Sequence, residues 1–314
     1  MTAESGQVAA AARARTVMGT VMGERKHLLS VGYRLLGSLV EAEDVVQEAY
    51  ARWYALPPRE QDEIVNVGAW LTTVTSRICL NLLTSARARR ETYVGDWLPE
   101  PLPDTARVEG PRHGEASVDP ADRVTLDESV GMALMVMMES MTPAERVAFI
   151  LHDVFGYPFA EIAEILGRSP AACRQLASSA RRRVRASRPV ATTAQAGRAD
   201  VVRRFRHAWE AKDIDALVGL LDPDVVATAD GGGRALTFLD PIEGRDQVVG
   251  AWLDIADRIA DVTLLDRTVN GQPGLVAQQD GATVTIFAFD VADDRIRRIW
   301  VVRNPEKLRS WSAA

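Results

Sequence analysis

Cysteine is scarce in this sequence of 314 residues, which contains only Cys79 and Cys173. The two lie far apart, and no CxxC motif or His/Cys cluster is present, which argues against a zinc site and a disulfide framework. We therefore expect no metal and no cofactor. Long apolar runs are also missing, and the first residues lack the charged-then-apolar order of a signal peptide. These absences predict a cytoplasmic protein with no membrane segment.

An excess of positive charge is missing as well. The chain has 37 Lys and Arg against 43 Asp and Glu, a net charge of -6, which excludes a protein that coats nucleic acid indiscriminately. Any DNA binding must therefore come from local basic patches. The hydrophobic share of 47% and the charged share of 25% are ordinary for a globular protein, and the length predicts two or three domains.

The stretch 157–185 has the pattern of a helix-turn-helix. Apolar residues recur at helical spacing up to Leu166, and Gly167 suits the left-handed end of a helix. Ser169 is a good N-cap for a second helix, and Pro170 suits its first position. The apolar face of that helix comprises Cys173, Leu176, Ala177, Ala180 and Val184. An ordinary helical hairpin with a solvated basic face is the alternative.

The polar face of the second helix is basic, and no acidic residue occurs between Glu164 and Asp200. Arg and Gln near the start of a helix reach base edges in a major groove, whereas later arginines neutralise phosphates. The candidate DNA-binding residues here are Ser169, Arg174, Gln175, Ser178, Arg181, Arg182 and Arg185.

The N-terminal third predicts three helices. Two of them lie between Lys26 and Tyr54 and are separated by Gly37 and Ser38, and the second carries an acidic cluster that by itself indicates only a solvated face. The cluster consists of Glu41, Glu43, Asp44, Gln47 and Glu48. The third helix runs from about Gly68 to Arg90. Its expected core face is Leu71, Val74, Ile78 and Leu82, and its basic face is Arg77, Asn81, Arg87, Arg89 and Arg90. That face fits a nucleic-acid channel or a surface helix whose terminal arginines are favoured by the helix dipole.

A segment rich in proline, glycine and charge follows, from Tyr93 to Thr125. Such a composition predicts an extended linker. Within it, the sequence DWLPEPLP places Trp97 and Leu98 among prolines, and an extended proline-rich backbone loses little entropy on docking. The segment is therefore either a recognition strip or a stiff linker.

The composition changes after Arg188 and predicts an α+β domain with a curved antiparallel sheet. Two helices are expected at 201–209 and 214–221, followed by strands at 262–269, 274–279, 283–290 and 295–302. Asp230, Asp240 and Asp254 are candidates for acid-base chemistry in an apolar pocket, although no paired His/Asp arrangement accompanies them. Three successive glycines in DGGGR, 230–234, need a structural reason, for which a flexible hairpin tip is the plain alternative.

Three blocks in this order resemble an extracytoplasmic-function (ECF) sigma factor of the sigma-70 family. They are LLSVGYRLLGSLVEAEDVVQEAYARWY, AWLTTVTSRICLNLL and the helix-turn-helix. The resemblance implies two all-α domains, a sigma-2 bundle and a sigma-4 helix-turn-helix. It implies that Asp44, Gln47 and Glu48 bind the β′ coiled coil of core RNA polymerase, with the β flap as a further contact. It also implies that the helix ending at Arg90 engages the −10 element and that the helix from Ser169 reads the −35 element of promoter DNA.

The C-terminal part resembles the SnoaL-like branch of the nuclear transport factor 2 superfamily, a cone with an internal pocket. DWLPEP, DGGG followed by a cation, and NPEKL together resemble the sigma J type of ECF sigma factor, in which this domain acts as a built-in regulator. The implied interdomain residues are Trp97, Leu98, Pro99, Glu100, Pro101, Asp230, Gly231, Gly232, Gly233, Arg234, Asn304, Pro305, Lys307 and Leu308. Arg234 stands where the group usually has Lys, and Ser179 where a basic residue is common.

We therefore predict a sigma factor without catalytic turnover, whose C-terminal domain modulates initiation. The expected divisions are a tail at 1–24, sigma-2 at 25–95, a linker at 96–125, sigma-4 at 126–188, a linker at 189–198 and the SnoaL-like domain at 199–314. One alternative is a one-component DNA-binding regulator that senses a small ligand in the C-terminal pocket. The other is a bifunctional protein with an active isomerase- or cyclase-like domain.

Overall fold

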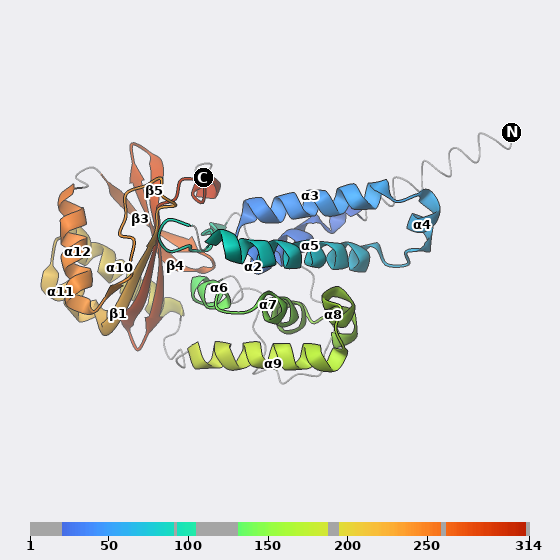
Figure 1. The fold of residues 1–314 in the computed structure, drawn as a ribbon. Helices are drawn as coiled ribbons and strands as arrows, with labels where there is room; N and C mark the ends of the chain where they lie inside the picture. Colours follow the sequence, from blue (N-terminus) through green and yellow to red (C-terminus); the bar gives the residue numbers. More distant parts are fainter. Residues whose placement is uncertain (1–20, 91–92, 105–130, 188–194, 259–261, 312–314) are drawn as a thin grey trace. The chain divides into compact units, whose positions relative to one another are not determined.

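The computed structural model describes residues 21–90, 93–104, 131–187, 195–258 and 262–311 (Figure 1). The chain divides into two compact units. Unit 1 consists of Met1–Ser85, Val108–Arg123 and Pro143–Ala177, and unit 2 consists of Ala86–Arg107, Val124–Thr142 and Ser178–Ala314. The described part of unit 1 is helical, and unit 2 contains the sheet. Within the described ranges, no helix is long and apolar enough to cross a membrane.

Unit 1 begins with the three helices predicted for the N-terminal third, α2 (Arg25–Leu36), α3 (Leu39–Ala55) and α5 (Val67–Arg90), the last of which continues into unit 2. A short helix that was not predicted, α4 (Pro58–Glu63), lies between α3 and α5. The predicted break is confirmed, because Gly37 is left-handed with φ 74° and the Ser38 side chain accepts a hydrogen bond from the N–H of Glu41. Capping residues therefore set the boundary between α2 and α3.

The predicted core face of α5 was partly wrong. Leu71 and Ile78 are buried, but Val74 and Leu82 are only half-buried. Among the side chains described for α5, the other buried positions are Thr72, Thr75, Ser76, Cys79 and Leu83. Of these buried hydroxyls, the Thr72 Oγ1 accepts a hydrogen bond from the Tyr157 hydroxyl on another segment, as described below.

The helix-turn-helix is confirmed. It consists of α8 (Phe159–Leu166) and α9 (Pro170–Ser187), preceded by α7 (Pro143–Phe149) and the π-helix η4 (Ile150–Val154). Gly167 ends α8 in the left-handed conformation with φ 61°, and the Ser169 Oγ accepts from the N–H of Ala172 at 3.2 Å. The predicted apolar face of α9 is buried apart from Leu176, which is half-buried.

Unit 2 contains a six-stranded sheet in the described part of the chain, with the order β2-β1-β6-β5-β4-β3. Its strands are β1 (Leu221–Asp230), β2 (Ile242–Glu243), β3 (Thr263–Val269), β4 (Gln272–Gln279), β5 (Ala282–Ala292) and β6 (Arg295–Val302). The α+β prediction is confirmed. The wholly antiparallel sheet is wrong, because β1 runs parallel to β6. The sequence at the start of β1, Asp222-Pro223-Asp224, is typical of a turn and hides the strand.

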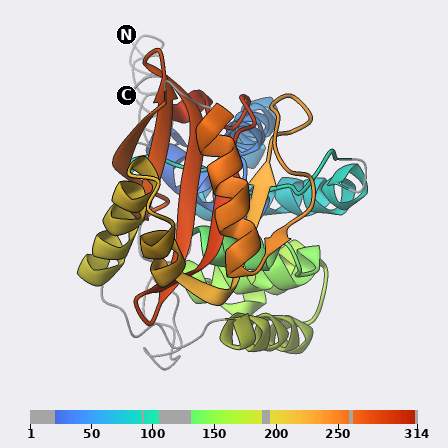
Figure 2. The same cartoon turned by 90° about the vertical axis from the view of Figure 1, so that its left-hand side faces the viewer.

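Side chains of the strands alternate between two apolar faces. One face is covered by α10 (Gln195–Glu210), α11 (Ile214–Leu220) and α12 (Arg245–Arg258), as Figure 2 shows. Five aromatic rings meet edge to face or tilted in this core, with neighbouring centroids 5.2–6.1 Å apart. They belong to Phe205, Trp209, Trp252, Phe287 and Phe289. Side chains therefore occupy the interior on this side of the sheet.

The opposite face is covered by segments from elsewhere in unit 2. Val276, Ile286, Ala288, Trp300 and Val302 lie on this face. They are covered by Leu98 of the proline-rich segment, Met132 of α6 (Met132–Met138), Leu308, and Trp311 of the 3-10 helix η5 (Arg309–Trp311). The proline-rich strip is therefore packed against the sheet, and it is not a free linker.

Candidate functional site

Residues 93–104, here called the strap, are held by the C-terminal part of unit 2. Its six consecutive residues from Leu98 to Pro103 are all buried. A segment this enclosed must satisfy its backbone polar groups internally, because water does not reach them. The groups that do so define the site.

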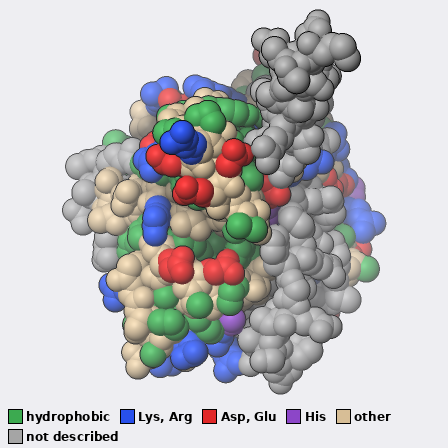
Figure 3. Space-filling view, turned by 90° about the vertical axis from the view of Figure 1, so that its right-hand side faces the viewer, with side chains coloured by type: hydrophobic (Ala, Val, Ile, Leu, Met, Phe, Trp, Pro, Cys, Tyr) green, Lys and Arg blue, Asp and Glu red, His purple; other side chains and the backbone are tan. Residues whose placement is uncertain are grey.

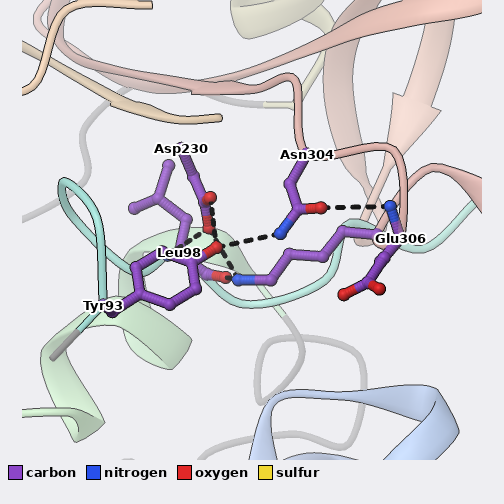
Figure 4. Close-up of polar contacts among 6 residues, drawn as sticks. Tyr93, Leu98, Asp230, Asn304 and Glu306 are labelled. Atoms are coloured by element: carbon purple, nitrogen blue, oxygen red, sulfur yellow. Dashed lines mark hydrogen bonds and ion pairs between the residues drawn. The ribbon is translucent and has the colours of Figure 1, made fainter. Parts of the chain in front are cut away.

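The first anchor of the strap is the carboxylate of Asp230, at the end of β1. Its side chain is fully buried on the strap side of the sheet. Oδ1 accepts a hydrogen bond from the Tyr93 hydroxyl at 2.6 Å, and Oδ2 accepts from the N–H of Leu98 at 2.9 Å (Figure 4). The Nζ of Lys307 lies 2.6 Å from Oδ2. One carboxylate therefore binds a side chain and a backbone amide of the strap together with a buried cation.

Lys307 completes this anchor. Its ammonium also donates to the carbonyl oxygen of Leu98, and it lies 4.1 Å from the ring centroid of Trp97 and 5.4 Å from that of Tyr93. A desolvated cation over an aromatic face gains about 2 kcal/mol. Lys307 therefore binds the strap through its backbone and through two of its rings.

The glycines of DGGGR have a specific reason in this site. A Cβ on Gly232 would lie 2.3 Å from the Nδ2 of Asn304, and Gly232 has φ 60°. That Nδ2 donates to the Tyr93 hydroxyl at 2.9 Å. A Cβ on Gly231 would lie 2.3 Å from the carbonyl oxygen of Ala235. The loop needs glycine because Asn304 and its own backbone approach so closely, so the flexible-tip alternative does not describe it.

Burial shifts the pKa values of two titratable side chains of the strap. Burial raises the pKa of Tyr93 far above its ordinary value, and its hydrogen bond to the Asp230 carboxylate raises that pKa further. Burial also raises the pKa of Asp96, and the nearby carboxylates of Asp240 and Asp230 add to the effect. At the surface, Arg234 and Glu306 form an ion pair at 2.9 Å, in which both side chains are about half exposed or more. The strap is therefore held from inside, and this exposed pair adds little.

A second anchor lies four residues along the strap. The N–H of Leu102 donates to the Oδ1 of Asn270 at 2.9 Å, and the N–H of Asn270 donates to the carbonyl oxygen of Leu102 at 2.9 Å. Between the anchors, the Nε1 of Trp311 donates to the carbonyl oxygen of Pro101 at 2.8 Å. Sequence reasoning missed Tyr93, Asn270 and Trp311. The Asn-Gly pair at 270–271 signals only a hairpin turn, and nothing in it indicates a strap contact.

The three carboxylates proposed for acid-base chemistry do not come together. Asp230 is engaged with the strap, Asp240 is exposed, and the side chain of Asp254 lies outside the described residues. A pocket of about 430 Å³ between α10, β3 and β4, lined by residues that include Val202 and Gly274, contains none of them. Within the described ranges, no group of His, Cys, Asp and Glu is arranged to hold a metal ion.

The acidic cluster predicted on α3 is a solvent-exposed face. Asp44, Gln47 and Glu48 are exposed at positions i, i+3 and i+4, while residues between them, such as Val45 and Val46, are buried. Glu48 pairs with Arg52 on the same helix. Figure 3 looks at the side of unit 1 that carries α4 and α8 and shows acidic side chains interspersed with apolar ones.

The basic candidates lie on two helices. On α5, Arg77 and Asn81 are exposed, whereas the side chains of Arg87, Arg89 and Arg90 lie outside the described residues. On α9, the exposed candidates are Ser169, Arg174, Gln175, Ser178, Arg182 and Arg185, and Arg181 is half-buried. The Ser169 hydroxyl is used as the N-cap, and the Arg174 guanidinium lies 5.8 Å from the ring centroid of Phe159.

Within unit 1, the segment just before α8 contacts α2 and α5 through three buried side chains that hydrogen-bond to one another. They are His27, Thr72 and Tyr157. The Tyr157 hydroxyl donates to Thr72 Oγ1 at 3.2 Å and lies 2.9 Å from the Nε2 of His27. Burial raises the pKa of Tyr157 to about 12. Nearby, the Arg77 guanidinium donates to the carbonyl oxygen of Glu164 at 2.9 Å. A predicted DNA-binding arginine is thus already bonded to α8.

A second contact in unit 1 joins α7 to the end of α2. The buried Arg146 guanidinium donates to the carbonyl oxygen of Leu35 at 3.0 Å, and burial lowers its pKa to about 10. In the opposite direction, the guanidinium of Arg34 on α2 lies 5.6 Å from the ring centroid of Phe155, which follows η4. One arginine on each side thus contacts the other segment.

Three family models match the chain. Sigma-70 region 2 matches residues 21–89, Sigma-70, region 4 matches residues 131–184, and the SnoaL-like domain matches residues 202–299. The chain is 40% identical over 297 residues to the ECF RNA polymerase sigma factor SigJ of Mycobacterium tuberculosis, covering 90% of each sequence. It is 36% identical over 284 residues to a probable ECF RNA polymerase sigma factor, SigI, of the same species, covering 90% of this chain and 92% of the relative.

The structure is also similar to a solved one. It matches the crystal structure of the M. tuberculosis extracytoplasmic function sigma factor SigJ with a TM-score of 0.68 and 36% sequence identity. The match covers 92% of this chain and 96% of that one. The likeness therefore extends over most of both the helical and the sheet-containing regions.

Proposed function

Because the chain belongs to the ECF sigma factors of the sigma-70 family, whose members bind core RNA polymerase and direct it to promoters, we propose which of its surfaces perform each step. Its relatives are sigma factors, which are initiation subunits and not enzymes. We assign a polymerase surface to α3, promoter surfaces to α5 and α9, and the coupling of these surfaces to the C-terminal domain to the strap.

The polymerase surface is the exposed acidic face of α3. Asp44, Gln47 and Glu48 project from one side of a helix whose other side is buried. A rigid helix that presents carboxylates and an amide can bind a basic partner without reorganising. We assign this face to the β′ coiled coil, and the region of the helix-turn-helix to the β flap.

The promoter surfaces are the two basic helix faces. Arg77 and Asn81 on α5, with the later arginines of that helix, are assigned to the −10 element. Arg174 and Gln175, in the first turns of α9, are placed to reach base edges of the −35 element. The other candidates at and along α9 would contact the DNA phosphates and thereby fix the position of the helix on the duplex. They are Ser169, Ser178, Arg181, Arg182 and Arg185. Arg77 donates one hydrogen bond to the carbonyl oxygen of Glu164, and its exposed guanidinium keeps further donors for DNA.

The regulatory part rests on one observation, the buried pair of Asp230 and Lys307 that holds the strap. The strap lies in sequence between the two sigma regions that match family models. Fixing it on the sheet restricts how those regions can be arranged, and drawing it out releases them. The C-terminal domain thus changes initiation by binding the strap, and its carboxylate Asp230 serves binding and not turnover.

The test is promoter-dependent initiation by bacterial core polymerase. The full chain is compared with Trp97→Ala/Leu98→Ala, which removes the ring over Lys307 and the side chain buried on the sheet, and with Leu236→Ala, an 80% exposed position, as the matched control. The double variant should change transcript yield at equal protein, and the control should not. Equal yields from all three chains would contradict the regulatory role. Tight duplex binding without polymerase would instead favour the one-component regulator.

A further inference from the structure

The contacts that hold the strap address its backbone more than its side chains. At the first anchor, the N–H of Leu98 donates to Asp230 and the carbonyl oxygen of Leu98 accepts from Lys307. Both peptide groups flanking one residue are therefore bound by charged side chains. These backbone contacts do not depend on which side chain the peptide carries. The buried side chains of Leu98 and Leu102 add a requirement for aliphatic residues at these two positions.

The second anchor repeats this pattern with an uncharged residue. Asn270 has φ 51°, a left-handed conformation that turns its backbone N–H and its side-chain oxygen toward Leu102. It thereby binds both the N–H and the carbonyl oxygen of that residue, as a neighbouring strand would. Pro103 pairs with Val269 in an antiparallel bridge next to it. The turn between β3 and β4 therefore acts as a short strand edge.

The spacing of the anchors matches the composition of the strap. In the run Leu-Pro-Glu-Pro-Leu-Pro, proline occupies every second position, so only Leu98, Glu100 and Leu102 have backbone N–H groups. Two of these three groups are bound by the anchors. An extended backbone with alternating proline is preorganised, so it loses little conformational entropy on binding. The two anchors thus select an extended peptide with proline between the anchored residues.

We propose that the C-terminal domain is a peptide receptor for extended, proline-alternating segments that carry aliphatic residues four positions apart. The strap is its occupant in cis. The occupant in trans is a segment of the same chemistry on a partner protein, which binds when the strap is drawn out and thereby stabilises the strap-free state. This inference rests on the proposed regulatory function, and it adds a partner that would control it.

Competition in cis determines when such a partner binds. A strap tethered to its receptor has an effective concentration in the millimolar range. A partner segment therefore binds the intact chain weakly, and it binds strongly only where the strap is weakened or engaged elsewhere. Its binding reports the position of the strap.

The test uses a fluorescent peptide with the sequence of residues 93–104 and the full-length chain. Fluorescence anisotropy should show that Trp97→Ala/Leu98→Ala binds this peptide at least about tenfold more tightly than the unaltered chain. A peptide with alanine in place of both leucines should bind at least about tenfold more weakly to the same variant. Adding Asn270→Gly to that variant should also weaken binding, because glycine keeps the left-handed turn and removes the side-chain oxygen.

Equal binding of the two peptides, or no binding by a folded strap variant, would overturn the proposal. Circular dichroism establishes that the variant is folded, and Leu98→Asp/Leu102→Asp is a second way to weaken the strap should the first variant unfold. If Trp97→Ala/Leu98→Ala changes transcription but does not bind the peptide, the receptor proposal fails while the regulatory function stands. If the double variant changes neither, both fail.

Discussion

The ammonium of Lys307 and the carboxylate of Asp230, 77 residues apart in sequence, form a buried ion pair at 2.6 Å, and both groups also bind the backbone of Leu98. A buried ion pair gains little over an apolar pair of the same shape. Removing one member, however, leaves an uncompensated buried charge, so the pair makes docking of the strap sensitive to a single substitution. The ion pair therefore adds little to stability, but it makes docking of the strap depend on both charges.

Asp230→Asn should weaken docking by about 2–4 kcal/mol, because asparagine keeps the shape and one acceptor but leaves the Lys307 charge without a counterion. Limited proteolysis within the strap, followed by mass spectrometry, measures the change. Asp280→Asn is the matched control, because Asp280 is exposed in the turn between β4 and β5. Equal cleavage of the two variants would show that the pair does not hold the strap.

Gly232→Ala should destabilise unit 2 more than Gly281→Ala does. Both glycines have positive φ, 60° and 77°, so each substitution incurs about 1–2 kcal/mol of backbone strain. Only at Gly232 does the new Cβ also meet Asn304, at 2.3 Å, whereas nothing lies within 4 Å at Gly281. Overpacking adds about 1–3 kcal/mol. Denaturant unfolding measures the difference, and equal midpoints would contradict the close approach of Asn304.

Tyr157→Phe should cost unit 1 about 1–2 kcal/mol near neutral pH, because the hydroxyl bonded to Thr72 and His27 is lost. Burial raises the pKa of this hydroxyl from 10.0 to about 12, so its contribution is complete below pH 10 and is lost as the pH rises through 12. Urea unfolding at pH 8 and at pH 11 measures both effects. Tyr54→Phe, at an exposed position, should change neither.

Asp96→Asn should strengthen docking of the strap at pH 7, by no more than about 1 kcal/mol after solvent screening. Burial raises the pKa of this carboxyl in the docked state, with Asp240 and Asp230 adding to the shift, so the docked form binds its proton more tightly than the released form. As the pH falls from 7 to 5, docking of the strap in the unaltered chain therefore becomes stronger, and the difference in docking free energy from the variant becomes smaller. Limited proteolysis within the strap at each pH follows docking. A difference in docking between the two chains that does not change with pH would show that titration of Asp96 does not affect docking.

Arg174→Ala should reduce discrimination among −35 sequences by about 1–3 kcal/mol, because this side chain is assigned to base edges. Arg182→Ala, on the same helix, should weaken binding to all sequences alike and lower its salt dependence. Competition between promoter variants for the polymerase complex measures both. Equal loss of discrimination in the two variants would contradict the division of roles.

Local signals predicted the helical parts well. Gly37, Ser38, Gly167 and Ser169 mark helix ends through their own backbone and side-chain chemistry, so adjacent residues suffice to place them. The four later strands were also predicted, because Val, Ile and Thr runs are separated there by turn residues. Short-range information is sufficient wherever the capping or turn chemistry is contained in a few residues.

The site was predicted only in part, because most of its contacts are long-range. Asp230, Asn304 and Lys307 were indicated by a resemblance of motifs, but their partner Tyr93 lies before the recognised strip, and Trp311 lies after the last motif. Nothing local distinguishes Asn270 from an ordinary turn asparagine, since its role depends on Leu102, 168 residues earlier. The parallel pairing of β1 with β6 has the same origin.

The long sequence separation between the strap and its anchors also has a consequence during synthesis. Lys307 follows Leu98 by 209 residues, and Trp311 follows Pro101 by 210. At roughly 5–20 residues per second, the ribosome needs roughly 10–40 s to go from one to the other. In the last part of that interval, after residue 184, both regions that match sigma-70 models have been made while the anchors of the strap are still incomplete. Each new chain therefore passes through an unrestrained period, which ends only when its last anchor has been translated.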